Sequence, residues 1–359
     1  MRALDPLSFS ILLDYDEPML YYKSKPLSKY DAVVPRVAAS SAQFGAAVVR
    51  QFEQMGVFCA NSSNGIFTSR DKFRASQTMT KRGIGIPRTA FVGSPAAVSG
   101  AVDYIGGAPL VVKLVTGSQG IGVTLAEHRQ TAVALVDMLQ SVGSETLMQS
   151  FVAESRGKDI RAFVVDGVVV AAMRRMASGD EFRSNIHRGG TAEPVELSEE
   201  YVDAAVRAAQ VIGLRVAGVD ILEAESGPMV IEVNSSPGLE GIEGATERNV
   251  AAEILDFVER ECHLPEIDIR QRLRMAQGHG ILEISVGAKS PLAGQSISSC
   301  ALGVDEIRVL TVTRAGRALA LPKSDFVFEP GDLAVIFGPS ELLRGLAPRR
   351  GRKRRTPRE

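Results

Sequence analysis

Two carboxylates and an amide interrupt a stretch of otherwise apolar sequence near the middle of the chain. Strands are predicted over 219–222 and 229–233, joined by a turn segment of Glu, Ser, Gly and Pro. Glu232 and Asn234 point to the same side of their strand, and Asp220 on the partner strand can face them. Oxygen donors that converge in this way suit magnesium. The alternative is three polar residues at the solvated ends of a hairpin, but acids in such apolar runs are costly to bury without a cation.

A lysine lies within a second apolar strand, predicted over 110–115. A buried ammonium group needs an anionic partner, so Lys113 indicates an anion close by. The following segment, 116–122, contains three glycines, which allow the backbone to approach a phosphate and offer its N–H groups. Because an apolar strand resumes at Val123, this is neither a Walker loop nor a dinucleotide-binding turn. We interpret it as a flap over a nucleotide, and the alternative is an ordinary hairpin turn.

A third group of polar residues occupies the loop 182–190, which ends in two glycines. Its basic and amide side chains suit an anionic substrate or a phosphoryl group in transfer. These side chains belong to Arg183, Asn185, His187 and Arg188. The alternative interpretation is a solvated surface loop.

Length and composition restrict the class of protein. The chain has 359 residues, 45% of them hydrophobic, which suits two or three domains with a sizeable core. Three scattered cysteines exclude a disulfide framework and a zinc ribbon, and favour the cytoplasm. No apolar run predicts a signal peptide or a membrane span. The net charge of −1 excludes a broad nucleic-acid surface, and the basic end at 349–359 is interpreted as a disordered solvated tail rather than an RNA contact.

Apolar periodicity and capping residues predict the elements that position these groups. Helices are predicted over 40–55, 69–82, 95–104, 131–140, 199–212 and 246–261, and strands over 32–34, 57–60, 87–92, 145–152, 162–165 and 168–173. Lys72 lies on the second helix, which Ser69 is expected to cap. The segment 237–244 is expected to be a glycine-spaced loop. Beyond a charged linker, a small unit is predicted with strands over 281–286, 307–313, 317–321 and 333–337, a helix near 295–300 and a last helix from 340.

Together these motifs resemble the ATP-grasp carboxylate–amine ligases, and in particular the RimK group, which adds glutamate to the C-terminus of ribosomal protein S-six. The likeness covers residues 4–262 and rests on segments 71–74, 107–115, 119–122, 182–190, 216–221 and 232–242. Residues 280–346, with motifs at 290–294 and 328–332, resemble the TrkA-C regulatory domain of potassium-uptake systems.

The resemblance implies an α/β (α+β) protein with an ATP-grasp fold and a small C-terminal domain. The expected domains are a pre-ATP-grasp domain at 1–69, the ATP-grasp domain at 70–262, a linker at 263–279, the TrkA-C-like domain at 280–346 and the basic tail at 347–359. Family members usually begin with a strand and a helix that this sequence lacks, so we expect the first domain to be truncated.

The resemblance also implies nucleotide-binding residues. ATP phosphates would be held by two lysines and the flap, namely by Lys72, Lys113, Gly117, Gln119, Gly120 and Gly122. The backbone of Ser150 and Phe151 would meet adenine, and Asp159 would reach the ribose. The family usually has glutamate where this chain has Ser150, which puts a side-chain contact to the nucleotide in doubt.

The remaining implied roles concern the transferring phosphoryl group. Asp220, Glu232 and Asn234 would bind two magnesium (or manganese) ions, with Glu232 bridging them. The phosphoryl group would be steadied by Arg183, with Ser184 and Asn185 beside it and Arg175 as a further catalytic candidate.

The implied reaction is ATP-driven amide formation through an acyl phosphate, in which glutamate supplies the amine and a protein C-terminus, that of a ribosomal protein, supplies the carboxylate. The expected partners also include a small ligand at the TrkA-C-like domain and further copies of the chain. Two alternatives stay open. The acceptor is a small molecule or oligoglutamate, or the protein is a non-catalytic regulator gated by a nucleotide.

Overall fold

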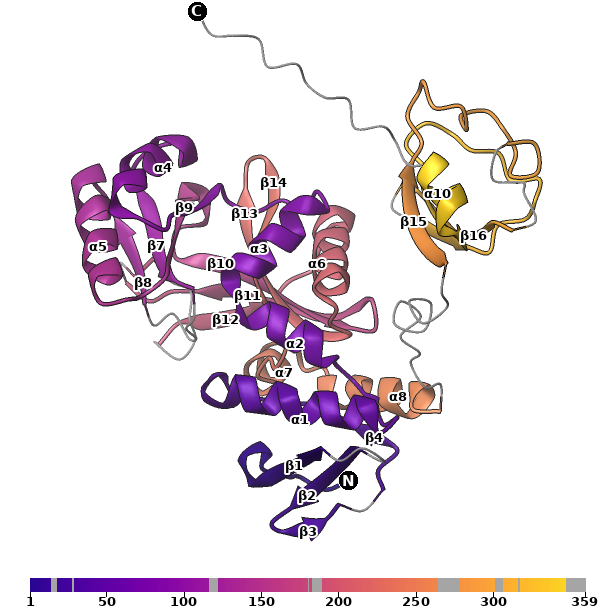
Figure 1. The fold of residues 1–359 in the computed structure, drawn as a ribbon. Helices are drawn as coiled ribbons and strands as arrows, with labels where there is room; N and C mark the ends of the chain where they lie inside the picture. The colour runs from indigo at the N-terminus through magenta and orange to yellow at the C-terminus, as the bar shows by residue number, and fades with distance from the viewer. Residues whose placement is uncertain are drawn as a thin grey trace, which may run out of the picture. The chain divides into compact units, whose positions relative to one another are not determined.

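The chain forms two compact units, which a computed structural model places at Met1–Pro265 and Glu266–Glu359. The structure describes residues 1–13, 18–27, 29–115, 122–179, 181–182, 189–263, 278–300, 306–315 and 317–346. Both units combine helices with antiparallel strands (Figure 1), which confirms the expected mixed α and β class. Among the described residues, no helix is long and apolar enough to cross a membrane.

A five-stranded antiparallel sheet forms the centre of the first unit. Its strands are, in spatial order, β12 (Thr191–Pro194), β11 (Val168–Met176), β10 (Lys158–Val165), β13 (Val216–Ala224) and β14 (Gly227–Asn234). β13 and β14 are the hairpin predicted from the metal-ligand pattern. β10 and β11 are joined at Asp166 and Gly167, whose positive φ angles of 49° and 79° fit the tight turn that this dipeptide predicts.

The two faces of this sheet differ in what covers them. On one face, α6 (Glu199–Ile212) packs its alanines and Ile212 against Ala162 and Val219. On the other face, α7 (Glu240–Thr246) and α8 (Val250–Glu261) cover only the end that carries Phe163 and its apolar neighbours. The opposite end of that face carries charged side chains, because the alternation of a strand places Asp159 and Arg161 on the same side as Phe163.

A second antiparallel sheet carries the lysine strand. Its order is β6 (Thr89–Phe91), β9 (Thr146–Ser150), β7 (Leu110–Leu114) and β8 (Val123–Ala126). The helices α4 (Val98–Ile105) and α5 (Arg129–Ser141) cover one face, where Leu110 and Val112 are buried (Figure 1). Lys113 follows Val112 and therefore projects from the opposite face.

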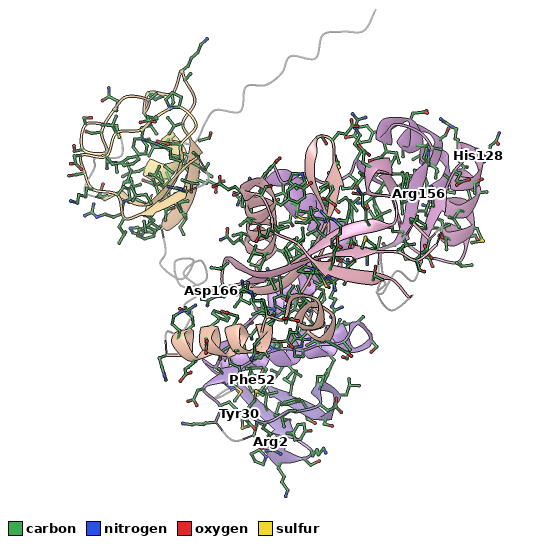
Figure 2. The ribbon with its side chains drawn as sticks, turned by 180° about the vertical axis from the view of Figure 1, so that it is seen from behind. Arg2, Tyr30, Phe52, His128, Arg156 and Asp166 are labelled. Atoms are coloured by element: carbon green, nitrogen blue, oxygen red, sulfur yellow. The ribbon has the colours of Figure 1, made fainter. Side chains whose placement is uncertain are left out.

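The N-terminal part contains strands that the sequence did not predict. β1 (Phe9–Leu13), β2 (Pro18–Tyr22) and β3 (Lys25–Pro26) form an antiparallel sheet, and only one residue of β1 is buried, so its apolar alternation is weak. Phe52 of α1 (Ala42–Gln54) packs against Phe9 with ring centroids 5.9 Å apart, and Figure 2 shows Phe52 close to Tyr30 in this region. The predicted strands at 32–34 and 57–60 form a short parallel pair, β4 (Ala32–Val33) and β5 (Phe58–Cys59).

Two helix predictions were wrong in their boundaries. The expected helix 69–82 is two helices, α2 (Ser63–Arg70) and α3 (Lys72–Lys81), which break at Asp71. Asp71 caps α3 by accepting a hydrogen bond from the Arg74 N–H at 2.9 Å, whereas the Ser69 hydroxyl donates to the Ile66 carbonyl inside α2. Likewise, the expected loop 237–244 contains the start of α7, and the following helix begins only at Val250, where the Asn249 side chain caps it.

The second unit is a four-stranded antiparallel sheet with one described helix. Its order is β15 (His279–Ser285), β18 (Leu333–Pro339), β16 (Arg308–Arg314) and β17 (Arg317–Ala320), and α10 (Ser340–Leu346) packs on β15 and β18. Phe328, Ile336 and Leu343 belong to its core. The helix expected near 295–300 is wrong, because these residues form turns held by hydrogen bonds among serines. Short 3-10 helices elsewhere in the chain lie at Pro6–Ser8, Ala39–Ser41, Pro95–Ala97 and Ala153–Ser155.

Candidate active site

The three predicted oxygen donors lie together at the charged end of the central sheet. Asp220 is the register partner of Glu232 across β13 and β14, and Asn234 is the partner of Gly218. Residues directly opposite each other in an antiparallel pair share one face, so all three side chains lie on the same side. The Asn234 Nδ2 atom is 3.5 Å from the Asp220 Oδ2 atom. The structure thus brings together the residues that the strand periodicity predicted to converge.

Two arginines already neutralise the buried aspartates at this end of the sheet. Arg161 donates from Nε and Nη2 to the two Asp220 oxygens, each at 2.7 Å. Arg175 donates in the same manner to Asp159, at 2.7 and 2.6 Å, and its Nη2 lies 3.1 Å from Asp220 Oδ2. We call these four residues the paired cluster. Sequence reasoning expected a metal ion to compensate the buried Asp220, but guanidinium groups provide compensation as well.

Within the paired cluster, Asp220 and Arg175 favour their charged forms. Asp159, Arg175 and Asp220 are each only 4% exposed. Burial by itself would raise the pKa of Asp220, but Arg161 and Arg175 outweigh it and hold that pKa below its usual range. Burial would also lower the pKa of Arg175, but Asp220 and Asp159 raise it above its ordinary value. The charged form of Asp220 is therefore favoured by the two arginines, and that of Arg175 by the two aspartates.

Lys113 faces the same site from the second sheet. Burial lowers its pKa to about 8, the attraction of Glu232 works against this shift, and the like charge of Lys72 adds to it. Lys72 is the first residue of α3. Two ammonium groups from separate elements therefore contribute positive charge to the same site. An anion between them would relieve their mutual repulsion, which is the arrangement that a polyphosphate requires.

The donor chemistry of the site fits magnesium if a substrate completes it. Within the described ranges, no group of three or more His, Cys, Asp and Glu side chains could hold a metal ion. Magnesium, however, commonly binds one or two carboxylates together with substrate phosphates and water. Glu232 and Asn234 supply such a partial set of oxygen donors. Asp220 can add to it, although its carboxylate also binds Arg161 and Arg175.

The expected adenine-binding segment lies at the end of β9. The Ser150 N–H donates to the Arg88 carbonyl at 2.9 Å, so this N–H group is already engaged within the protein. The Arg156 guanidinium lies over the Phe151 ring, 5.9 Å from its centroid (Figure 2). Both carboxylate oxygens of Asp159, the expected ribose ligand, accept hydrogen bonds from Arg175.

Several expected contacts lie outside the described residues, namely those of Gly117, Gln119, Gly120, Arg183, Ser184 and Asn185. At the described end of the flap, Gly122 has a φ of 72°, and a Cβ atom there would come within 2.5 Å of the Leu114 side chain, so only glycine fits. A cavity of about 530 Å³ is lined by Val123, Phe182 and neighbouring residues, including His128 at the start of α5 (Figure 2). The start of β8 and Phe182 therefore line a common cavity.

Sequence reasoning missed Arg161, although a signal for it existed. Arg161 lies two positions after Asp159, and within a strand such as β10 this spacing places both on one face. It also missed Arg36 and Arg70, which contact segments far away along the chain and carry no local signal.

Comparisons with known proteins identify the family of each domain. Residues 69–258 match the RimK-like ATP-grasp domain, residues 1–66 the RimK PreATP-grasp domain, and residues 281–349 the TrkA-C domain. A probable alpha-L-glutamate ligase of Rhodopirellula baltica is 51% identical over 356 residues, which is 99% of this chain and 88% of that protein. A probable alpha-L-glutamate ligase of Vibrio parahaemolyticus is 49% identical over 258 residues, 72% of this chain and 86% of its own length.

Solved structures show the same fold at low sequence identity. The ATP-grasp ligase PsnB, complexed with minimal precursor, Mg and ADP, is 21% identical with a TM-score of 0.55, covering 72% of this chain and 87% of its own. A RimK domain protein ATP-grasp from Sphaerobacter thermophilus is 20% identical with a TM-score of 0.51, covering 71% and 85%. The chain belongs to the RimK-like ATP-grasp family and carries a C-terminal TrkA-C domain.

Proposed function

We propose that this protein is an ATP-dependent ligase that adds L-glutamate to a C-terminal carboxylate. The observation that carries this proposal is the meeting of Lys113, from one sheet, with Glu232 and Asp220 on the other. Cations and oxygen donors on facing elements suit a nucleotide triphosphate and the charge that moves during phosphoryl transfer. The names of the relatives support glutamate as the added amino acid.

The reaction has two steps. A carboxylate oxygen of the acceptor attacks the γ-phosphorus of ATP, so an acyl phosphate forms and ADP leaves. The amine of glutamate then attacks the acyl carbon, an amide bond forms, and phosphate leaves with the former carboxylate oxygen. The amine loses a proton in this step. Neither step requires a covalent bond to the protein.

The protein's contribution is to bind and orient charged groups. Lys72 and Lys113 bind the ATP phosphates. Asp220, Glu232 and Asn234 would hold two magnesium (or manganese) ions, which, when bound, neutralise charge on those phosphates. Arg161 fixes the Asp220 carboxylate through two hydrogen bonds, and Arg175, which is itself bound to Asp159, adds one ion-pair contact to Asp220. Arg183 and Asn185 are proposed to contact the transferring phosphoryl group.

The proposed acceptor is the C-terminus of a small-subunit ribosomal protein, S-six, for which the family resemblance is the support. Oligoglutamate or a small carboxylate is the alternative acceptor. The TrkA-C domain is proposed to bind a small regulatory ligand, and the chain is proposed to form homo-oligomers.

The function can be tested by mass spectrometry of products formed from ATP, magnesium and L-glutamate. One reaction contains the S-six C-terminal peptide, a second its C-terminally amidated form, and a third no acceptor. We expect glutamyl additions on the free peptide only, with equal release of ADP. Oligoglutamate formed without peptide would identify the alternative acceptor. Tight ATP binding without ADP release in all three reactions would contradict the ligase and favour a nucleotide-gated regulator.

A further inference from the structure

Two arginines next to the candidate active site form no ion pair with a carboxylate of the described residues. Arg36 follows β4, and Arg70 is the last residue of α2, a helix that packs against β14. Within the described part of the chain, neither guanidinium forms an ion pair. Both differ in this respect from Arg161 and Arg175 on the adjoining sheet face.

The hydrogen bonds of these arginines place them at the end of β14. Arg36 donates from Nη2 to the Pro237 carbonyl at 2.6 Å, and Arg70 donates from Nη2 to the Val37 carbonyl at 2.5 Å. The Val37 N–H donates to the Ser236 hydroxyl at 3.1 Å. Ser236 and Pro237 directly follow the metal-ligand candidate Asn234 and its neighbour. The two guanidinium groups therefore adjoin the end of the strand that carries Glu232.

Both arginines retain hydrogen-bonding capacity. A guanidinium has more N–H donors than the single one that each group uses on a backbone carbonyl. The Arg70 Nε atom is buried and has no hydrogen-bond partner among the residues that the structure describes, although buried donors are nearly always paired. Burial lowers the pKa of both groups, and only for Arg70 does a carboxylate, that of Glu232, partly offset it. The Arg36 side chain is exposed, so its remaining donors face solvent, and together with the buried Arg70 Nε they are accessible to an anion.

The chemistry of the reaction indicates which anion this is. Lys72 and Lys113 already serve the ATP phosphates, and the acceptor carboxylate becomes an uncharged amide. The incoming glutamate keeps both of its carboxylates throughout, so at least one needs a cationic partner when water is excluded. A planar guanidinium matches a carboxylate in geometry. We propose that Arg36 and Arg70 bind a carboxylate of the incoming glutamate and so position its amine. This inference rests on the proposed ligase function.

The test compares ligand binding by the full-length protein and three variants. Arg36→Gln and Arg70→Gln remove the cations, and Arg50→Gln is the matched control, because Arg50 is exposed on α1. Calorimetric titrations with L-glutamate and with glutarate are carried out in the presence of magnesium and ADP. We expect affinity for both ligands to fall about 10- to 100-fold in each cation-removing variant, with ADP affinity unchanged and Arg50→Gln like the wild type.

Further arms identify the carboxylate and its source. Glutamine lacks the side-chain carboxylate of glutamate, and isoglutamine lacks the α-carboxylate. If Arg70→Gln leaves the affinity for one of these two ligands unchanged, the carboxylate missing from that ligand is the one that the arginines bind. If the variants instead weaken binding of a non-glutamate peptide with a free C-terminus, the subsite takes the acceptor and the proposal is wrong. A parallel loss of ADP affinity would also overturn it, because it would indicate a phosphate contact.

Two controls separate this proposal from folding defects and from the ligase function. Arg70→Lys keeps the charge without the planar fork, and intermediate glutamate affinity is expected. If Arg70→Gln fails to fold, the glutamate affinities of Arg70→Lys and Arg36→Gln test the proposal instead. Wild-type glutamate affinity in both variants would overturn it. Arginine-dependent glutamate binding without any turnover would count against the ligase function alone. Absence of glutamate and glutarate binding by the wild type would contradict this subsite.

Discussion

Two sets of charged residues share the end of the central sheet, and they differ in whether their charges are matched. In the paired cluster, Arg161 and Arg175 bind the carboxylates of Asp220 and Asp159 through hydrogen bonds of 2.6–2.7 Å. The second set is Arg36, Arg70, Lys113 and Glu232, which we call the open groups. Within the described ranges, none of these four forms an ion pair.

This difference separates residues that hold the site from residues that await a ligand. In the paired cluster, each buried charge already has its counterion, so removing one partner leaves another charge uncompensated. We propose that the open groups gain their counterions from phosphates, a metal ion or a substrate carboxylate. Mutations in the two sets should therefore differ in kind. The first should reduce folding stability, and the second should reduce binding and turnover.

The largest effect is expected for Arg175→Met in the paired cluster. It leaves Asp159 without its partner and Asp220 with one partner fewer, and we expect the free energy of unfolding to fall by about 3–5 kcal/mol. Arg70→Gln, which removes one hydrogen bond to a carbonyl, should lower it by only about 1 kcal/mol. Urea denaturation of both variants checks this. Equal losses of stability would remove the distinction between the two sets.

Glu232→Gln is expected to affect turnover much more than folding stability. The Glu232 side chain makes no hydrogen bond or ion pair within the described residues, so the free energy of unfolding should change by less than about 1 kcal/mol. Turnover should fall about 100- to 1,000-fold, because a negative oxygen donor next to the phosphates is lost. Parallel kinetics and denaturation test this. A large loss of stability with normal turnover would place Glu232 in the structural set.

The smallest expected effect concerns the protonation of Lys113. Its pKa of about 8 means that the ligand-free protein loses this proton as the pH rises through that value. Bound phosphates favour the protonated form, so ADP binding should take up a proton and become about tenfold weaker between pH 7 and pH 9. Titrations in buffers of different ionisation enthalpy measure the uptake. Lys113→Arg, whose charge is fixed, should abolish it, and an unchanged uptake in this variant would refute the assignment.

Those features of the site that depend on neighbouring residues in the sequence could be predicted. Those that depend on contacts between distant segments could not. Strand alternation was sufficient to place Glu232 and Asn234 on one face and to single out Lys113 in an apolar strand. The pairing of Arg161 with Asp220 depends on the register between β10 and β13, which local patterns do not determine. Arg36 reaches Pro237 across 201 residues, and no periodicity signals such a contact.

Errors in the predicted elements have equally specific causes. Ser69 and Asp71 are both capping residues, and tertiary structure selects Asp71 because a separate helix already ends at Arg70. The strands of the N-terminal sheet escaped prediction because solvent covers much of β1, and its side chains lack the apolar alternation of a half-buried strand.

The central claim is that a carboxylate is activated by phosphoryl transfer, and oxygen-18 labelling tests it most directly. The acceptor peptide is prepared with labelled oxygen in its C-terminal carboxylate and incubated with ATP, magnesium and L-glutamate. With both carboxylate oxygens labelled, the account predicts one labelled phosphate for each peptide that receives its first glutamate, as the acyl phosphate requires. A peptide that carries one added glutamate and has released no labelled phosphate would contradict it.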